Sequence, residues 1–183
     1  GIFLGDTSTG ELPVALSSSS WGEIATFLKS GSRKAKIFRK TSETSVLVEL
    51  DLNGSGRPDI HTGLAFFDHM LEQIARHGGV DLTVKVEGDL EVDEHHTIED
   101  TGIVLGECFA EALGRKKGIE RYGFALPMDE AKAEVLLDFG GRACLVWQVE
   151  LSREYVGDFP TEMTKHFFDS FCQSCKCNLH VTA

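Results

Sequence analysis

Two adjacent histidines and a nearby carboxylate are the residues of this sequence best suited to chemistry. They lie in the run Glu94-His95-His96-Thr97-Ile98-Glu99-Asp100, which is predicted to begin a helix. On a helix His95 and Glu99 share a face, whereas His96 points about 100° away from His95. We therefore expect the two imidazoles to serve two different ions, or two different surfaces, with Glu99 joining one of them.

Two more histidines accompany predicted amphipathic helices. The first helix, near residues 66–77, ends at glycines and has His69 off the centre of its apolar stripe. The second, near residues 161–171, has His166 beside its stripe. The two predicted stripes consist of Phe66, Phe67, Met70, Leu71 and Ile74, and of Met163, Phe167, Phe168 and Phe171.

The two histidine helices indicate an internal duplication. A strand-like run begins thirteen residues after His69, at Leu82, and another thirteen residues after His166, at Leu179. By the same offset, a second His-His-x-x-Glu element would fall beyond Ala183. We infer that the sequence is a fragment and that about half of the metal-binding set lies outside it.

The elements that must position these side chains follow an α+β pattern. Alternating strands are predicted at 34–39, 46–52, 82–86, 131–138, 143–151 and 178–183, with helices between them and a turn at Gly140-Gly141. The helix after His95 is predicted to bury Ile98, Leu105, Phe109 and Leu113 and to end at Gly114. We expect sheets that are covered on one face by helices.

The first 32 residues differ in texture from the rest. Gly5 to Gly10 and Ser17 to Ser20 have the composition of linkers, and a small helix is predicted from Trp21 to Leu28. We therefore divide the chain into a tail at 1–32 and a domain at 33–183.

Composition argues against several classes of partner. The net charge of −11 makes nucleic acid a poor partner, and no apolar run is long enough to span a membrane. The first residues do not have the pattern of a secretory signal, and the cysteine count of five is odd, so we expect reduced thiols and a cytoplasmic location.

Three cysteines lie close together in the sequence as Cys172-x-x-Cys175-x-Cys177. A soft-metal site is one interpretation of this spacing. Small buried cysteines at the passage from a helix to a strand are the better one, because no second pair completes a tetrahedral set.

Four blocks of the sequence closely resemble imidazoleglycerol-phosphate dehydratase of histidine biosynthesis, over about residues 33–183. The blocks are Phe67-Asp68-His69-Met70-Leu71, Gly88 to Thr101, Gly118 to Phe124, and Leu126-Pro127-Met128-Asp129-Glu130. The tail at 1–32 more weakly resembles the end of the phosphatase domain in bifunctional histidinol-phosphatase/dehydratase enzymes. The sequence contains no aspartate nucleophile motif of the haloacid-dehalogenase type, so we assign it no phosphatase activity.

The resemblance implies a fold and an assembly. In the family each half is a four-stranded sheet with two helices, of the ribosomal protein S5 domain 2-like type, and the halves pack helix against helix. The second half is incomplete in this sequence. The family also implies a large homo-oligomer of 24 subunits with active sites at the subunit contacts. Because the histidines of one half diverge, we expect metal binding to drive that assembly.

The resemblance also implies roles for single residues. Two manganese ions would be held by histidines and glutamates from both halves, which here correspond to His69, His95, His96, Glu99 and His166. Glu43 matches a substrate-contacting glutamate that acts as acid or base. Substrate contacts are further implied for Arg121 and Arg142, which suit phosphate, and more weakly for His77 and Asp129. His77 is otherwise a helix-end cation and Asp129 otherwise a turn residue.

The implied reaction explains the need for metal. Removal of water from imidazoleglycerol phosphate abstracts a carbon-bound proton that no neighbouring carbonyl acidifies, so the imidazole ring must accept electron density, and a Lewis acid on its nitrogens makes this possible. The product is imidazole acetol phosphate. Two alternatives remain open: a metal-dependent phosphoester hydrolase, and a non-catalytic metal-binding or assembly fragment.

Overall fold

The computed structural model describes residues 2–4, 16–30 and 33–183. The chain divides into two compact units, Gly1–Arg33 and Lys34–Ala183. This division lies one residue from the predicted boundary, whereas the phosphatase-like origin of the first unit stays a prediction. No helix among the described residues is long and apolar enough to cross a membrane.

The first unit pairs two short strands and adds one helix. β1 (Ile2–Leu4) and β2 (Leu16–Ser18) are parallel, and α1 spans Trp21–Ser30. The predicted helix is confirmed, but the linker interpretation is wrong for Ser17 and Ser18, which belong to β2. The side chain of Ser18 is buried and donates a hydrogen bond to Glu23 in the first turn of α1. The predicted linker from Gly5 to Gly10 lies outside the described residues.

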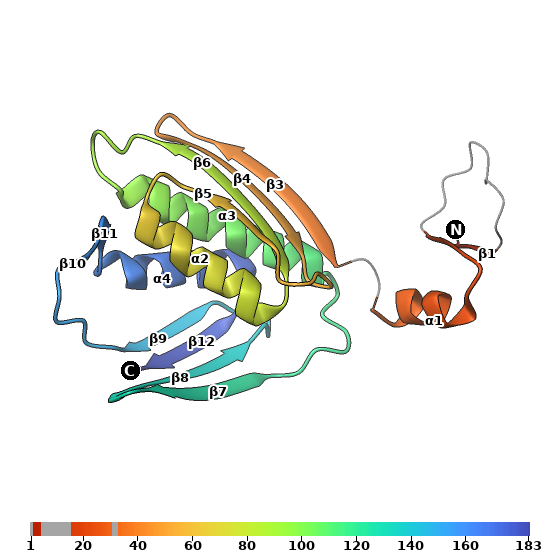
Figure 1. Ribbon diagram of the computed structural model, residues 1–183. Helices are drawn as coiled ribbons and strands as arrows, with labels where there is room; N and C mark the ends of the chain where they lie inside the picture. Colours follow the sequence, from red (N-terminus) through yellow and green to blue (C-terminus); the bar gives the residue numbers. More distant parts are fainter. Residues whose placement is uncertain (1, 5–15, 31–32) are drawn as a thin grey trace. The chain divides into compact units, whose positions relative to one another are not determined.

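The second unit begins with a four-stranded sheet and two helices. Its strands run in the order β3-β4-β6-β5, with β5 parallel to β6 and the other pairs antiparallel. α2 packs over β5 and β6, and α3 packs over β3 and β4 (Figure 1). The elements are β3 (Lys34–Lys40), β4 (Thr44–Asp51), β5 (Pro58–His61), α2 (Ala65–Gly78), β6 (Asp81–Gly88) and α3 (His95–Leu113).

The rest of the second unit repeats this sheet, with one helix, α4, among the described residues. The order β7-β8-β12-β9 has the same topology, with β12 antiparallel to β8 and parallel to β9. α4 packs on β9, as α2 packs on β5, and a small β10–β11 hairpin precedes it. The elements are β7 (Tyr122–Met128), β8 (Ala131–Asp138), β9 (Cys144–Gln148), β10 (Tyr155–Val156), β11 (Phe159–Pro160), α4 (Met163–Cys175) and β12 (Asn178–Thr182). The α+β class and the internal repeat are confirmed.

Two strands of the four-stranded sheets were not predicted from the sequence patterns. β5 has four residues and begins at a proline, and β7 contains Gly123 and Pro127, both of which are unfavourable within a strand. β7 tolerates Pro127 because it is an edge strand that pairs only with β8. The stripe predicted for α2 is wrong at Met70, which is 45% exposed, whereas Phe67, Leu71 and Ala75 are buried.

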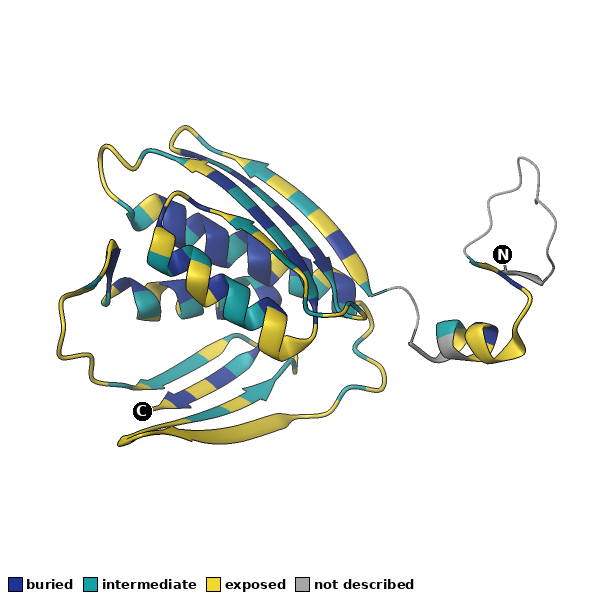
Figure 2. Ribbon diagram, in the orientation of Figure 1, coloured by how far each residue is buried: buried dark blue, intermediate teal, exposed yellow. Residues whose placement is uncertain are grey.

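The two halves meet through their helices, as expected. α3 and α4 lie side by side between the two sheets, and most buried residues are on these helices and the first sheet (Figure 2). Gly102 and Gly106 of α3 make the close approach possible, because a Cβ at these positions would lie 2.8 Å from the carbonyl oxygen of Phe167 and 2.6 Å from that of Phe171. Small residues four apart thus let the backbone of α4 contact α3 directly.

Candidate functional site

The close contact of α3 and α4 brings three predicted ligands together. His95 Nε2 lies 3.0 Å from Glu99 Oε2, one helical turn away, as the spacing predicts. The rings of His95 and His166 have centroids 5.5 Å apart, although the residues belong to different halves of the sequence. We call His95, Glu99 and His166 the His95 group.

His96 belongs to a different group. Its ring is inclined by 72° to that of His95, and its Nδ1 lies 3.3 Å from Asp89 Oδ2. The hydrogen bond to Asp89 raises the pKa of His96, and the charge of Glu43 adds to this effect. The pKa of Glu43 is lowered, first by a hydrogen bond with the Ser42 side chain and to a smaller extent by the charge of His96. We call His96, Asp89 and Glu43 the His96 group.

A buried carboxylate joins the Glu43 turn to the helix of the histidines. Asp100 is 9% exposed, and its carboxylate accepts hydrogen bonds from Arg39 of β3 and Thr44 of β4. The turn itself is closed because Thr44 N–H donates to Thr41 Oγ1 at 2.9 Å and Glu43 N–H donates to the same oxygen at 3.2 Å. The position of Glu43 relative to α3 is therefore fixed by Asp100.

The donors have the right chemistry for a divalent metal but are too few in one place. Imidazole nitrogens and carboxylate oxygens are ligands that manganese accepts. Within the described part of the chain, however, no group of three or more His, Cys, Asp or Glu side chains is arranged to hold an ion. The residue types therefore fit the metal that the resemblance implies. The number of ligands found together is too small, so further ligands must come from another part of the protein or from another copy.

α2 carries two predicted residues and is held by the second half. Asp158, in the β10–β11 turn, accepts from the N–H groups of Ala65 and Phe66 at 2.6 and 3.1 Å, and so caps the helix on which His69 lies. Among the described residues, no hydrogen bond or ring contact joins His69 to another predicted ligand. His77 lies in the last turn of α2, 3.1 Å from Gln73, where a helix-end role suffices.

The three remaining substrate candidates all lie in the second half. Arg121 donates from Nε to Asp138 Oδ2 at 3.1 Å, beside a hollow of about 400 Å³ that is also lined by Lys116 and Gly140. Arg142 is exposed after the Gly140–Gly141 bend. Asp129 has a φ of 51° in the β7–β8 turn, so its turn position is confirmed. Their contacts with a substrate stay predictions.

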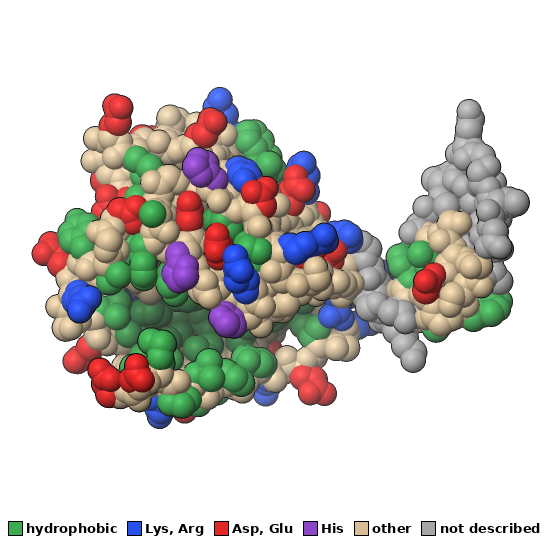
Figure 3. All heavy atoms as spheres, in the orientation of Figure 1, with side chains coloured by type: hydrophobic (Ala, Val, Ile, Leu, Met, Phe, Trp, Pro, Cys, Tyr) green, Lys and Arg blue, Asp and Glu red, His purple; other side chains and the backbone are tan. Residues whose placement is uncertain are grey.

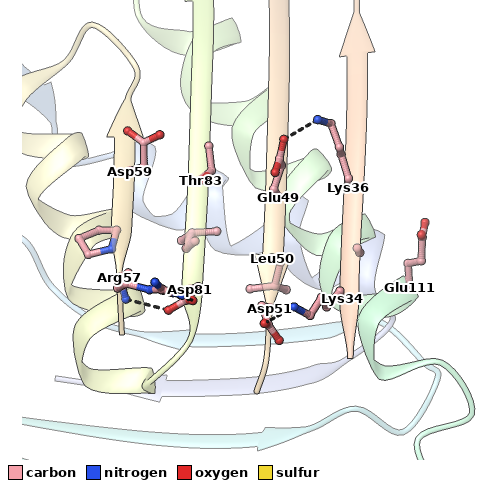
Figure 4. A pocket seen from close by; sticks show the side chains of 13 residues that line it. Lys34, Lys36, Glu49, Leu50, Asp51, Arg57, Asp59, Asp81, Thr83 and Glu111 are labelled. Atoms are coloured by element: carbon pink, nitrogen blue, oxygen red, sulfur yellow. Dashed lines mark hydrogen bonds and ion pairs between the residues drawn. The ribbon is translucent and has the colours of Figure 1, made fainter. Parts of the chain in front are cut away.

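A hollow of about 710 Å³ lies over the first sheet, on the face turned away from its helices (Figure 4). Its charges are paired across the strands, with Lys36 Nζ 2.5 Å from Glu49, Lys34 Nζ 2.9 Å from Asp51 and Arg57 Nη2 2.5 Å from Asp81. No predicted site residue lines it. Because its cations are already neutralised, we do not place the chemistry there.

The cysteines behave as the packing interpretation expects. Cys172, Cys175 and Cys177 are fully buried in the core of the second half, at the passage from α4 to β12. Cys172 and Cys177 occupy the two ends of the helix-terminating turn, where a small apolar contact is common, and Cys177 N–H donates to the Cys172 carbonyl at 3.3 Å. Cys108 is buried in the first half and Cys144 is exposed.

Sequence reasoning missed three carboxylates that organise the site: Asp89, Asp100 and Asp158. Asp100 directly follows Glu99, and its buried helical position was the available signal. Asp89 and Asp158 lie in turns, and only the fold shows which groups they contact.

Comparison with known proteins bears on the family of the chain. Residues 62–183 match the family model described as imidazoleglycerol-phosphate dehydratase. The chain is 59% identical over 169 residues to the histidine biosynthesis bifunctional protein HisB of Bacteroides fragilis, covering 92% of this chain and 45% of that protein. It is 54% identical over 177 residues to HisB of Spirosoma linguale, covering 97% and 46%. The chain thus spans about half the length of these relatives.

Solved structures share the fold. The crystal structure of imidazoleglycerol-phosphate dehydratase from Staphylococcus aureus subsp. aureus N315 superposes with a TM-score of 0.71 at 29% identity, covering 81% of this chain and 82% of that one. The enzyme from Pyrococcus furiosus, in complex with (S)-C348, gives a TM-score of 0.64 at 27% identity, covering 80% and 78%.

Proposed function

The chain belongs to the imidazoleglycerol-phosphate dehydratase family, and from this premise we propose that it takes part in the dehydration of imidazoleglycerol phosphate to imidazole acetol phosphate. The reaction is a hydro-lyase step of histidine biosynthesis, and we propose that it takes place in the cytoplasm. The observation that best supports the proposal is the His95 group, in which α3 and α4 bring together His95, Glu99 and His166 within the region that the family model covers.

We propose manganese as the cofactor, held by the His95 group, by His96 and by His69. Bound Mn²⁺ would supply a Lewis acid for the imidazole ring of the substrate. Glu43 would accept and return the proton, because it lies close enough to His96 for the two charges to interact. Its lowered pKa favours the ionised, proton-accepting form and makes that form a weaker base than an ordinary glutamate. Arg121 and Arg142 would bind the phosphate, and for Arg121 the phosphate must compete with Asp138.

The shortage of donors among the described residues is consistent with ligands that come from a further part of the protein or from a neighbouring subunit. We propose a large homo-oligomer, of 24 subunits by family resemblance, in which neighbouring copies complete the ligand sets. Light scattering of the purified protein before and after treatment with a chelator tests this coupling. A mass that does not change when metal is stripped overturns it.

The activity is tested by adding Mn²⁺ and imidazoleglycerol phosphate to the purified protein and following ketone formation, with inorganic phosphate measured in parallel. Ketone without phosphate supports the dehydratase, whereas phosphate release indicates a phosphoester hydrolase. Mn²⁺ binding with neither product leaves the non-catalytic metal-binding alternative.

Variants assign the effect to the site. Glu43→Gln is expected to lower kcat about 10²- to 10⁴-fold, the usual contribution of a general acid or base. His95→Ala is expected to abolish binding of one manganese equivalent. His180→Ala is the matched control, because His180 is an exposed histidine on β12.

A further inference from the structure

Asp89 makes a directional contact with the His96 ring that no predicted role explains. An ionised carboxylate only accepts hydrogen bonds, so at the 3.3 Å contact the proton must lie on His96 Nδ1. The neutral ring then has its lone pair on Nε2, at the opposite edge.

We propose that Asp89 is a positioning residue that holds His96 in the Nδ1–H tautomer and presents its Nε2 as an electron-pair donor to a divalent cation. Carboxylates often orient metal-binding histidines in this way, by accepting from the ring nitrogen that does not bind the ion. The cation in this inference rests on the proposed function, whereas the tautomer does not.

The backbone places Asp89 for this contact. Gly88, at the end of β6, lies so close to the first turn of α3 that a Cβ there would be 2.0 Å from Thr97 Oγ1. The next residue, Asp89, is therefore level with His96. Its carbonyl accepts from Val92 N–H at 2.7 Å, which closes the turn, so the carboxylate is held on a short, fixed segment.

The carboxylate is also desolvated on one side. Asp89 Oδ1 is buried and has no hydrogen-bond partner within the described part of the chain, so the bond from His96 to Oδ2 is the one side-chain contact that compensates its burial there. A half-buried carboxylate with one good donor holds that donor more strongly than an exposed one would.

The neighbouring histidine shows the opposite arrangement. His95 directs Nε2, and not Nδ1, to its carboxylate partner Glu99. Adjacent imidazoles on one helix thus present different ring nitrogens, because their carboxylates come from different places: Glu99 from the next turn of α3 and Asp89 from the turn that follows β6. His95 and His96 therefore differ in the ring nitrogen that faces a carboxylate as well as in the direction of their rings.

The tautomer is read by NMR of the metal-free chain labelled with ¹⁵N-histidine, at about pH 9, well above the ordinary imidazole pKa. Signals of His96 are identified by their loss in His96→Gln. We expect Nδ1–H in the unmodified chain and in Asp89→Asn, whose amide oxygen still accepts. In Asp89→Ala we expect a shift toward Nε2–H. An unchanged His96 spectrum in Asp89→Ala overturns the proposal.

Mn²⁺ titration followed by electron paramagnetic resonance gives the second measurement. Asp89→Ala is expected to weaken binding about 10- to 100-fold, and Asp89→Asn less. Glu91→Gln is the control, because it removes a charge from an exposed residue of the same loop and should bind as the unmodified chain does.

The two measurements separate the two proposals. If the unmodified chain binds no Mn²⁺, its residues and those of neighbouring copies do not suffice to hold the proposed cofactor, and the NMR result still decides the role of Asp89. Equal weakening by Asp89→Ala and Glu91→Gln shows a general charge effect and overturns the positioning role. Circular dichroism of each variant ensures that folded protein is compared.

Discussion

The two halves of the second unit have the same strand order but bury it differently. The first sheet is covered by α2 and α3, and Val46, Val48 and Val84 are inaccessible to solvent. Among the helices that the structure describes, α4 packs on the second sheet and α3 reaches its core through Phe109. In the part of the chain that the structure describes, no helix covers the inner face of β7, and Phe124, Leu126 and Met128 are 47%, 55% and 76% exposed. Figure 3 shows apolar side chains lining a hollow on one face of the molecule.

The difference shows what the second helix contributes. β7 alternates apolar residues on one face just as β4 does, so its sequence is suited to burial, but a strand is buried only if another layer covers it. β7 is thus paired within the second sheet without being buried, and helix packing decides which residues of the sheet become core. A contiguous exposed apolar face of this kind is typical of a surface that packs against another segment or another molecule.

The largest expected effect comes from the same substitution made in both halves. Leu105→Ala in α3, where the side chain is 1% exposed, should lower the free energy of unfolding by about 2–5 kcal/mol. Leu126→Ala in β7 should change it by less than about 0.5 kcal/mol. Urea unfolding followed by circular dichroism measures both. Equal losses would show that β7 is packed in solution, and the comparison of the halves would fail.

A smaller effect is expected at the seam between the halves. Gly106→Ala places a methyl group against the α4 backbone, which must move, and should cost about 1–3 kcal/mol. The shift should also separate His95 from His166 and weaken Mn²⁺ binding. Ala112→Gly, also in α3, is the control, because it changes the flexibility of the helix backbone without adding a methyl group. Gly79→Ala does not serve, because Gly79 has a positive φ. A Gly106→Ala variant with unchanged stability would contradict direct helix contact.

The cap that the second half provides to the first should contribute less. Asp158→Ala removes the acceptor for two N–H groups of α2 and should cost about 0.5–1 kcal/mol. Burial opposes the charged form of Asp158, but the N–H groups of Phe66 and Ala65 outweigh it and lower its pKa. Because this pKa is lower in the folded state than in the unfolded state, the ionised carboxylate stabilises the fold at pH values above the unfolded-state pKa. That stabilisation is lost on acidification. The difference in stability between Asp158→Ala and the unmodified chain should therefore be full at about pH 7 and shrink as the pH falls below the ordinary carboxyl pKa of about 4. A difference that stays undiminished in acid would exclude the cap.

Thiol labelling gives the finest comparison of the two cores. Cys144 is exposed and should react at once with a thiol reagent, whereas the buried thiols should wait for local opening. Burial raises the pKa of Cys108 to about 12, and a hydrogen bond with Cys177 together with burial also raises the pKa of Cys172, so these shifts slow both thiols and do not set their order. Labelling followed by mass spectrometry should find Cys172 modified before Cys108, because the second core has fewer covering layers. The reverse order would place the weaker packing in the first half.

Local sequence patterns predicted the elements whose signals come entirely from residues that are neighbours along the chain. The alternation of β4, the stripe of α4 and the pairing of His95 with Glu99 depend on neighbours along the chain, and all three are found as expected. β5 and β7 were missed because their pairing partners, and not their own residues, make them strands.

The arrangement of the site was predictable in part for the same reason. The divergence of His95 and His96 follows from helix geometry alone. That His166 would lie beside His95 required the repeat and the small residues Gly102 and Gly106, which a composition pattern does not reveal as a contact surface. The contact of Asp89 with His96 depends on where a strand ends against a helix, which only the tertiary structure provides.

The Asp158 cap also has a consequence for the order in which the protein folds. The carboxylate lies 93 residues after Ala65, whose N–H it accepts, so a ribosome has exposed the whole of α2 long before its partner is synthesised. The start of that helix must stay hydrated or frayed until the later segment arrives, and contacts this distant in sequence form slowly. Maturation of the His69 segment is thus tied to completion of the β10–β11 hairpin, so truncation before that hairpin removes a partner on which the earlier half depends.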